Sequence, residues 1–352
     1  MEKVKNMERA LDEIASGEGE GFWAQRETIL QRYGQNKGEH GLAIKILSIF
    51  GGLLATVAFG GFLGLLDLFD SGAVTLGLGL AILVFSMVIQ RNFRSLALDS
   101  LGISLYVLGM ILLIFAMVQF EVRGNHTALL VCFVALCSLP LSKNYMLDFI
   151  SVLAIAGALL YLILANEIPS LIHVYVTFFC LSLAFCLLGE AKFLAARPLL
   201  SRLHGPLRIG LVFSFLMGLY ALGTSDPAPN PWVSALPAVA IILGLIPSIT
   251  KTLGASPRGR TLIYILVALA LLPTLFAPAI AGSLLLVLLS FKVNYRTGLA
   301  LGIIALAYFT IQFYYDLNLD LLTKSILLLA SGLLFLACHL LLFKRNRAHE
   351  KN

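Results

Sequence analysis

The sequence predicts an all-α protein, a polytopic transmembrane helical bundle of about twelve spans with both termini in the cytoplasm. Hydrophobic residues make up 59% of the 352 residues, charged residues make up 12%, and the mean hydropathy is +0.92. These values lie far outside the range of soluble globular domains. Long apolar runs fill nearly all of the chain between Leu42 and Phe343, and basic residues gather in alternate gaps between them. We therefore expect a transmembrane domain over residues 42–343.

The first 41 residues have a different composition from the rest of the chain. They hold eight of the nineteen acidic residues and six of the twenty-five basic residues. Val4, Met7 and Leu11 recur at helical spacing, and the polar stretch "SGEGEG" at residues 16–21 interrupts the pattern. No apolar signal-peptide core and no small-residue cleavage site is present. We expect residues 1–41 to form a cytoplasmic helical region that docks on the membrane domain or on a partner.

Twelve apolar runs approach or reach the ~17–25 residues that a helix needs to cross a bilayer. They cover residues 42–66, 72–90, 96–119, 127–141, 146–165, 168–189, 207–223, 232–250, 261–277, 279–291, 298–315 and 321–343. The fourth and tenth runs are short. The tenth continues the ninth, and Pro273 and Pro278 interrupt them, so the two form either a tight hairpin or one long kinked helix. A bundle of ten spans, without the fourth and tenth, remains the alternative.

The distribution of Lys and Arg favours an even number of crossings. Basic residues in short loops are held on the cytoplasmic side of a membrane. With twelve spans and a cytoplasmic N-terminus, 23 of the 25 basic residues fall on that side, including those of the tail at residues 344–352. Arg123 falls in an outer loop, and Lys324 lies just inside the last span. The pI of about 9.1 follows from these loops and requires no nucleic-acid partner.

Ionisable residues at the outer ends of the spans form the candidate binding site. Outer carboxylates such as Asp67 and Asp226 are explained by solvation alone. His173 and Lys324 lie within spans, where an ionisable group is costly and usually faces the interior of the bundle. The candidate binding residues taken from this end are Glu167, His173, Asp316, Asp320 and Lys324.

Small and weakly polar residues share one side of several predicted spans. His173, Thr177 and Cys180 do so in the sixth span. In the third span, Asp99 shares a side with Gly102, Tyr106 and Met110. Such stripes either line a polar path through the bundle or are the surfaces by which ordinary transmembrane helices pack. Both interpretations stay open, and we expect His173 to face other helices.

Lys324 needs a partner if it is to remain charged at the edge of the last span. Asp320 lies four residues before it, the order that favours an ion pair between i and i+4 and that places the acid at the positive N-terminus of the helix. Asp316 and Glu167 are alternative partners. A lysine that reaches the interface alone is the other interpretation.

The sequence contains no phosphate-binding G-x-x-x-x-G-K-[ST], no H-E-x-x-H and no dinucleotide-binding glycine pattern. We expect neither a cofactor nor a metal. The five cysteines lie inside predicted spans without a C-x-x-C pair and are expected to be small buried hydrophobes. In the first span, Gly51, Ala55, Gly60 and Gly64 recur at a spacing that allows close helix approach.

The stretch Phe313–Leu336, "FYYDLNLDLLTKSILLLASGLLFL", contains a tyrosine pair, a short turn, leucines, a Lys-Ser pair and a glycine. The residues of this pattern are Tyr314, Tyr315, Leu321, Leu322, Lys324, Ser325 and Gly332. The stretch resembles the C-terminal part of domain-of-unknown-function family 4401, whose members are multi-pass bacterial membrane proteins. Asp320 departs from the neutral residue that the pattern has there.

The resemblance implies a place in the bacterial inner membrane. It also implies a complex with a second multi-pass protein and a small protein carrying a "GDYxxLxY" sequence, and it adds Tyr314 and Tyr315 to the candidate binding residues. It brings no known activity. We expect a non-enzymatic subunit of a membrane complex or a secondary-transport-like protein. The alternative is a membrane-embedded enzyme that acts on lipid- or glycan-linked substrates at the periplasmic interface.

Overall fold

The computed structural model describes residues 42–66, 70–92, 96–190, 198–224, 232–252 and 257–316, together with residues 195, 230 and 329. Within these ranges the regular elements are eleven α-helices and one 3-10 helix, which confirms the all-α class. Seven of these described helices are long and apolar enough to cross a membrane. The expected N-terminal helices, the last span apart from residue 329, and the basic tail lie outside the described residues.

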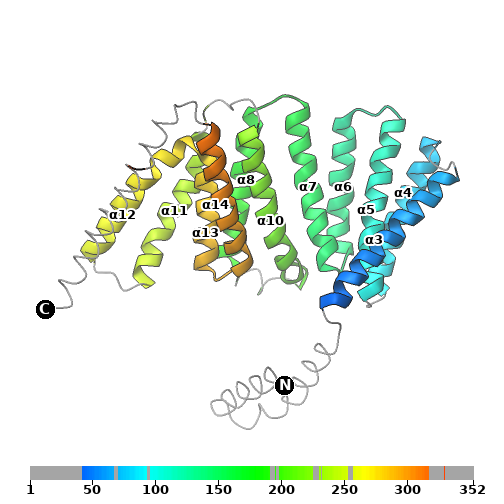
Figure 1. Ribbon diagram of the computed structural model, residues 1–352, viewed down its shortest axis with the longest axis horizontal. Helices are drawn as coiled ribbons and strands as arrows, with labels where there is room; N and C mark the ends of the chain where they lie inside the picture. The colour runs from blue at the N-terminus through cyan, green and yellow to red at the C-terminus, as the bar shows by residue number, and fades with distance from the viewer. Residues whose placement is uncertain are drawn as a thin grey trace, which may run out of the picture. The chain divides into compact units, whose positions relative to one another are not determined.

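The described helices belong to two compact units, which divide the chain between Glu121 and Val122. The first unit contains α3 (Leu42–Leu65), α4 (Gly72–Asn92) and α5 (Leu96–Gln119). The second contains α6 (Gly124–Leu141), α7 (Tyr145–Ala165), α8 (Ser170–Leu188), α10 (Pro198–Thr224), α11 (Trp232–Thr252), α12 (Pro257–Leu271), the 3-10 helix η2 (Pro273–Phe276), α13 (Pro278–Lys292) and α14 (Arg296–Asp316). Figure 1 labels the α-helices.

These helices coincide with the first eleven predicted spans to within a few residues, with two exceptions. The helix α10 begins at Pro198, nine residues before the predicted start at residue 207. The helix α12 ends at Leu271, short of the predicted end at residue 277, and η2 follows it as a separate element. The short fourth run becomes α6, whose 18 residues suffice for a membrane span. The count of twelve spans and the cytoplasmic termini remain predictions.

The ninth and tenth predicted spans form two separate helices and not one kinked helix. Pro273 begins η2 and Pro278 begins α13, the positions at which proline fits because the first amide groups of a helix have no intrahelical acceptor. The chain reverses direction between α12 and α13 (Figure 1). At 15 residues each, both helices are shorter than a typical span.

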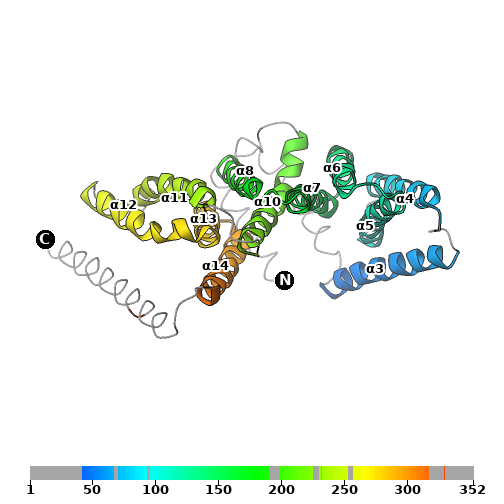
Figure 2. The same ribbon diagram turned by 90° about the horizontal axis from the view of Figure 1, so that it is seen from above.

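In the first unit, α5 packs between α4 and α3 (Figure 2). The Ser86 hydroxyl of α4 donates a hydrogen bond of 2.6 Å to the Gly102 carbonyl of α5. Tyr106 and Met110 continue the same buried side of α5. The polar stripe predicted on the third span therefore packs against a neighbouring helix, which favours the packing interpretation for this span.

The glycine contact predicted for the first span is confirmed at Gly60 and wrong at Gly51 and Ala55. A Cβ built on Gly60 would lie 3.3 Å from Cδ1 of Leu108 in α5. Gly51 and Ala55 are exposed, and a Cβ built on Gly51 meets nothing within 4 Å. The close approach is made by Gly52, where a Cβ would lie 3.0 Å from the backbone carbon of Ser100 in α5. Thr56, one turn later, is also buried. The packed face of α3 thus includes Gly52, Thr56 and Gly60, and it leaves out Gly51 and Ala55 of the predicted set.

The second unit has its core where α8, α10, α11 and α13 meet. Phe215 of α10 and Leu285 of α13 are fully buried there. Large apolar side chains on the outer flanks, such as Phe178, Phe185 and Ile304, are exposed. Such flanks suit hydrocarbon chains, because an apolar surface of this kind in water would be unfavourable.

The four described cysteines differ in burial, whereas the sequence predicts that all of them are buried. Cys180 and Cys186 are buried and all four described cysteines are free. Cys137 is exposed and Cys132 is only partly buried, so the expectation of buried positions is wrong for these two. Cys338 lies outside the described residues.

Candidate functional site

His173 lies in the first turn of α8 and is 6% exposed. Its Nδ1 atom is 2.6 Å from the hydroxyl oxygen of Ser234, which lies in the first turn of α11 and is also buried. This hydrogen bond links two helices whose starts lie at the same end of the second unit. The prediction that His173 faces other helices is confirmed.

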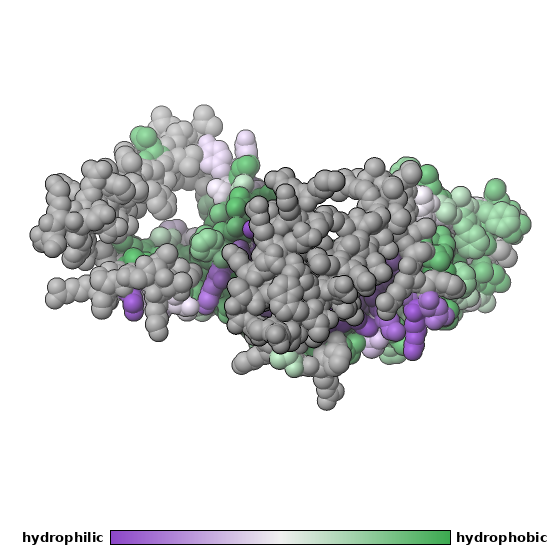
Figure 3. All heavy atoms as spheres, turned by 90° about the horizontal axis from the view of Figure 1, so that it is seen from below, coloured by the Kyte–Doolittle hydropathy of each residue, from purple (hydrophilic) through white to green (hydrophobic). Residues whose placement is uncertain are grey.

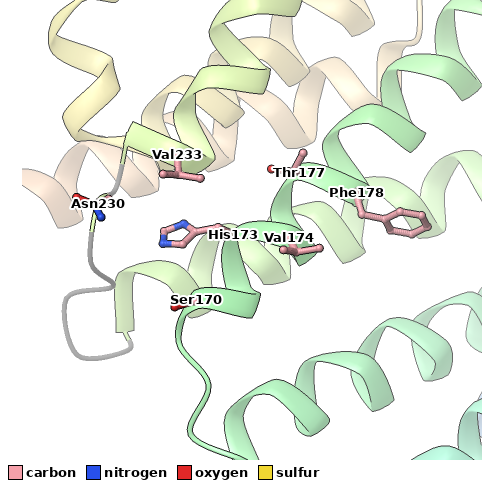
Figure 4. A pocket seen from close by; sticks show the side chains of 7 residues that line it. All are labelled: Ser170, His173, Val174, Thr177, Phe178, Asn230 and Val233. Carbon is pink, nitrogen blue, oxygen red and sulfur yellow. The ribbon is translucent and has the colours of Figure 1, made fainter.

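A hollow of about 500 Å³ opens beside this histidine. We call it the His173 hollow, and its described lining residues are Ser170, His173, Val174, Thr177, Phe178, Asn230 and Val233. The His173 ring points from α8 toward Asn230 and Val233, and Thr177 and Phe178 follow further along α8 (Figure 4). His173 and Thr177, which were predicted to share one side of the helix, thus both line the hollow.

Asn230 is held in place by the local backbone. Its φ of 64° lies in the left-handed region, which asparagine tolerates better than most residues. Its carbonyl accepts a hydrogen bond of 3.1 Å from the amide of Val233. This turn leads directly into α11 and brings the Asn230 amide group to the wall of the hollow.

The described wall of the hollow combines apolar and polar side chains. Apolar side chains supply much of the wall, and a few polar groups converge on it, the arrangement common in ligand pockets. The hydrogen bond to Ser234 fixes the orientation of the His173 ring. Hydroxyl, amide and imidazole groups can both donate and accept hydrogen bonds, so the wall suits a small polar solute.

The opposite end of the second unit holds a cluster of charged side chains that we call the ionic clasp: Asp148, Glu190, Arg202 and Arg208. Arg202 of α10 places its Nε atom 3.9 Å from Oδ2 of Asp148 in α7. Its Nη2 atom donates a hydrogen bond of 2.7 Å to the Leu139 carbonyl near the end of α6. A cation at the end of one helix and an acid in the first turn of the next both suit the helix dipoles.

Arg208, six residues further along α10, makes the second half of the clasp. Its Nη1 atom donates to Oε1 of Glu190 at 3.3 Å. The guanidinium carbon also lies 4.0 Å from the centre of the Tyr295 ring, a cation–π contact between α10 and the α13–α14 connection. Burial raises the pKa of Tyr295, and the Arg208 charge opposes this rise.

A family model described as "Domain of unknown function (DUF4401)" matches residues 41–345. The chain belongs to this family. The match covers the whole predicted membrane domain, so it confirms the resemblance carried by the C-terminal stretch. No curated protein and no solved structure matches the chain.

In this DUF4401 chain the other predicted site residues do not join His173. Glu167 is exposed, has a φ of 52° in the turn between α7 and α8, and is not among the described residues of the hollow. Tyr314 and Tyr315 contact each other edge to face at 5.7 Å near the end of α14, and neither lines the hollow as described. Asp316 ends α14, and Asp320 and Lys324 lie outside the described residues, so the ion pair of Lys324 stays a prediction.

Sequence reasoning missed the partners of His173 and the whole ionic clasp. Ser234 and Asn230 carry no signal, because a serine or asparagine at the start of a span is common. Asp148 and Glu190 did carry one, since each is an acid at the edge of an apolar run. Within the described residues, no group of three or more His, Cys, Asp and Glu side chains is placed to hold a metal ion.

Proposed function

We propose that this DUF4401 protein is a multi-pass protein of the bacterial inner membrane that binds a small polar solute in the His173 hollow and acts as a secondary-transport-like protein. The observation that supports this most is the His173–Ser234 hydrogen bond at the wall of a cavity of about 500 Å³. Ionisable residues inside membrane spans are costly, and those present usually mark a solute or ion path.

The membrane-embedded enzyme is the less favoured alternative. Such an enzyme needs at least two ionisable groups that converge on one substrate. His173 is the single ionisable side chain among the described residues that line the hollow. A hydrogen-bonding wall with one histidine suits binding and release better than acid–base catalysis.

The charge distribution supports an outer position for the His173 hollow. The ionic clasp lies at the other end of α8, about 25 Å from His173 when the helix rises 1.5 Å per residue. Viewed from below, the molecule shows purple, hydrophilic side chains in several places between the grey atoms and the green, apolar flanks (Figure 3). Because basic residues stay on the cytoplasmic side, we assign the ionic clasp to the cytoplasm and the His173 hollow to the periplasm.

Reporter fusions test this orientation. A fusion at Asn352 should be active in the cytoplasm, whereas a fusion inserted within residues 225–229 should be active in the periplasm, because the end of α10 and the start of α11, which flank this insertion point in the sequence, lie at the end that carries the hollow. Paired alkaline phosphatase and fluorescent protein reporters measure both positions. A periplasmic signal from Asn352 would contradict the twelve-span and ten-span topologies alike.

Solute binding is tested with the purified full-length chain. Small polar solutes, grouped as sugars, amino acids, organic acids and amines, are screened for an increase in the thermal unfolding midpoint. A solute at about 100 times its Kd should stabilise the protein by ~2.7 kcal/mol. His173→Gln and Ser234→Ala should abolish this stabilisation, since they remove the hydrogen bond at the wall of the hollow.

His204→Gln is the matched control. His204 is also a buried histidine, but its Nε2 atom lies 3.3 Å from the Cys186 carbonyl at the opposite end of α8. The solute should stabilise this variant as it stabilises the wild type. Stabilisation that survives in His173→Gln would exclude the hollow as the binding site. Co-purification of a second multi-pass protein with the native chain, together with no response to any solute class, would favour a complex subunit instead.

A further inference from the structure

The ionic clasp joins several helices of the second unit to the first part of α10. Its first half connects α10 to Asp148 of α7 and to the Leu139 carbonyl near the end of α6. Its second half connects α10 to Glu190, just past the end of α8, and to Tyr295 in the connection between α13 and α14. The two arginines of one helix therefore hold four other parts of the chain together at the end assigned above to the cytoplasm.

The opposite end of the same unit is more open. The His173 hollow, of about 500 Å³, lies there, and the His173–Ser234 hydrogen bond joins α8 to α11 beside it. Further along the helices, Phe215 of α10 and Leu285 of α13 are fully buried in the core. A solute in the hollow can therefore pass to the cytoplasmic end only if helices move apart, and the clasp resists that movement.

The contacts of the clasp are of a kind that can break and form again. Glu190 and Arg208 have side chains that are 35% and 25% exposed, so water can replace their contact at low cost. Among the described residues, six buried side-chain polar atoms have no hydrogen-bond partner in the protein, and three of them belong to the clasp: Oδ1 of Asp148 and the Nε atoms of Arg202 and Arg208. Water that enters between separated helices would supply these missing partners. Opening the clasp thus costs less than opening a network whose polar groups are all satisfied.

We infer that the ionic clasp is the cytoplasmic gate of a transport cycle in which the His173 hollow opens alternately to the two sides of the membrane. This inference rests on the solute binding and transport proposed above. In the structure described here the clasp is closed and the hollow opens toward the periplasm. When α10 moves away from α7 and from the end of α8, the clasp opens and the hollow becomes accessible from the cytoplasm, as in transporters that open by movement of packed helices around a fixed site.

A cysteine in the hollow tests the gate without any solute. Thr177→Cys in the full-length chain places a thiol on the wall of the hollow, and labelling of the parent chain, which keeps its native cysteines, is subtracted. A charged maleimide that does not cross membranes is added to right-side-out or to inside-out vesicles. The rate of labelling is measured from each side. With an intact clasp, labelling should be faster from the periplasmic side.

Glu190→Gln then opens the gate. It should raise the cytoplasmic labelling rate by on the order of tenfold and lower the periplasmic rate, because a contact made only in the closed clasp is lost and the equilibrium shifts toward the inward-open form. General loosening of the helices would raise both rates. Tyr295→Leu, which removes the ring beside Arg208, is a second variant and should shift both rates in the same directions. The reversed pair Glu190→Arg with Arg208→Glu should bring the rates back toward those of the intact clasp.

Arg296→Gln is the matched control, because Arg296 is an exposed arginine at the same end of the unit and lies outside the clasp. Both of its labelling rates should change by less than about twofold, the effect of an exposed charge. Unchanged rates in Glu190→Gln and in Tyr295→Leu would overturn the gate and leave solute binding in the hollow intact, and equal rates from the two sides with an intact clasp would also overturn it. If the clasp variants shift the rates as expected but no solute class stabilises the protein, the gate is supported and the proposed function fails.

Discussion

Arg202→Met should lower the free energy of unfolding of the membrane domain by about 1–3 kcal/mol, because it removes one partner from a partly buried ion pair. The Asp148 side chain is 1% exposed and the Arg202 side chain is 30% exposed, so the pair is partly shielded from water. Arg202 also donates to the Leu139 carbonyl, and its loss leaves that carbonyl at the end of α6 without this donor. Unfolding of the purified protein in mixed detergent micelles measures the change.

Two further variants separate this effect from a general loss of positive charge. Arg296→Met removes an exposed arginine at the same end of the second unit and should change stability by less than about 0.5 kcal/mol. Asp148→Asn combined with Arg202→Met should be more stable than the sum of the two single losses predicts, because no unpaired charge remains. Additive losses in the double variant would show that the two side chains do not stabilise each other.

The sequence predicts the helices of this protein well because their boundaries are marked by strong composition changes. Apolar runs end at charged or proline-rich gaps, and the length of each run is limited by the thickness of a bilayer. His173 is found for the same reason, since an ionisable residue within such a run is an exception that calls for a buried partner. Its partner Ser234 is 61 residues away, and local patterns contain no information about contacts at that separation.

The ionic clasp could not be predicted from the sequence, because a predicted span is an apolar run and is taken to end where charged residues begin. Arg202 and Arg208 were counted with the cytoplasmic bases, so the seventh span was predicted to begin at residue 207. In the structure α10 continues back to Pro198 and includes both arginines, which contact Asp148 and Glu190. These acids lie 54 and 18 residues away in the sequence, and only the folded arrangement shows which charges meet.

The rotation of each helix about its axis is the property that the sequence predicts least well. In water, polar residues mark the outer face of a helix, but lipid chains are as apolar as a protein core. The first span has small residues at both 51 and 52 and at both 60 and 61, so the sequence does not show which glycine of each pair faces the neighbouring helix. A shift of one residue rotates the face by 100°, which is why the prediction chose Gly51 although Gly52 makes the contact, and was right at Gly60.

Close packing of α4 against α5 leads to the second large effect. Gly109→Ala should destabilise the protein by about 1–3 kcal/mol, the usual cost of overpacking a well-packed contact. A Cβ at Gly109 would lie 2.7 Å from Cγ of Leu83 and 3.1 Å from the Gly79 carbonyl oxygen. Leu83 is 3% exposed and the Gly79 carbonyl belongs to the backbone of α4, so the two helices must move apart to admit one methyl group.

Gly77→Ala supplies the matched comparison, because it adds the same methyl group to α4 at an exposed position where a Cβ meets nothing within 4 Å. Its stability should be unchanged or slightly higher, since alanine is a better helix former than glycine. Thermal unfolding in detergent, followed by the loss of monodisperse protein on a sizing column, measures both variants side by side. Equal stability of the two alanine variants would mean that α4 and α5 tolerate a wider separation, and the glycine contact would then not determine how these two helices pack.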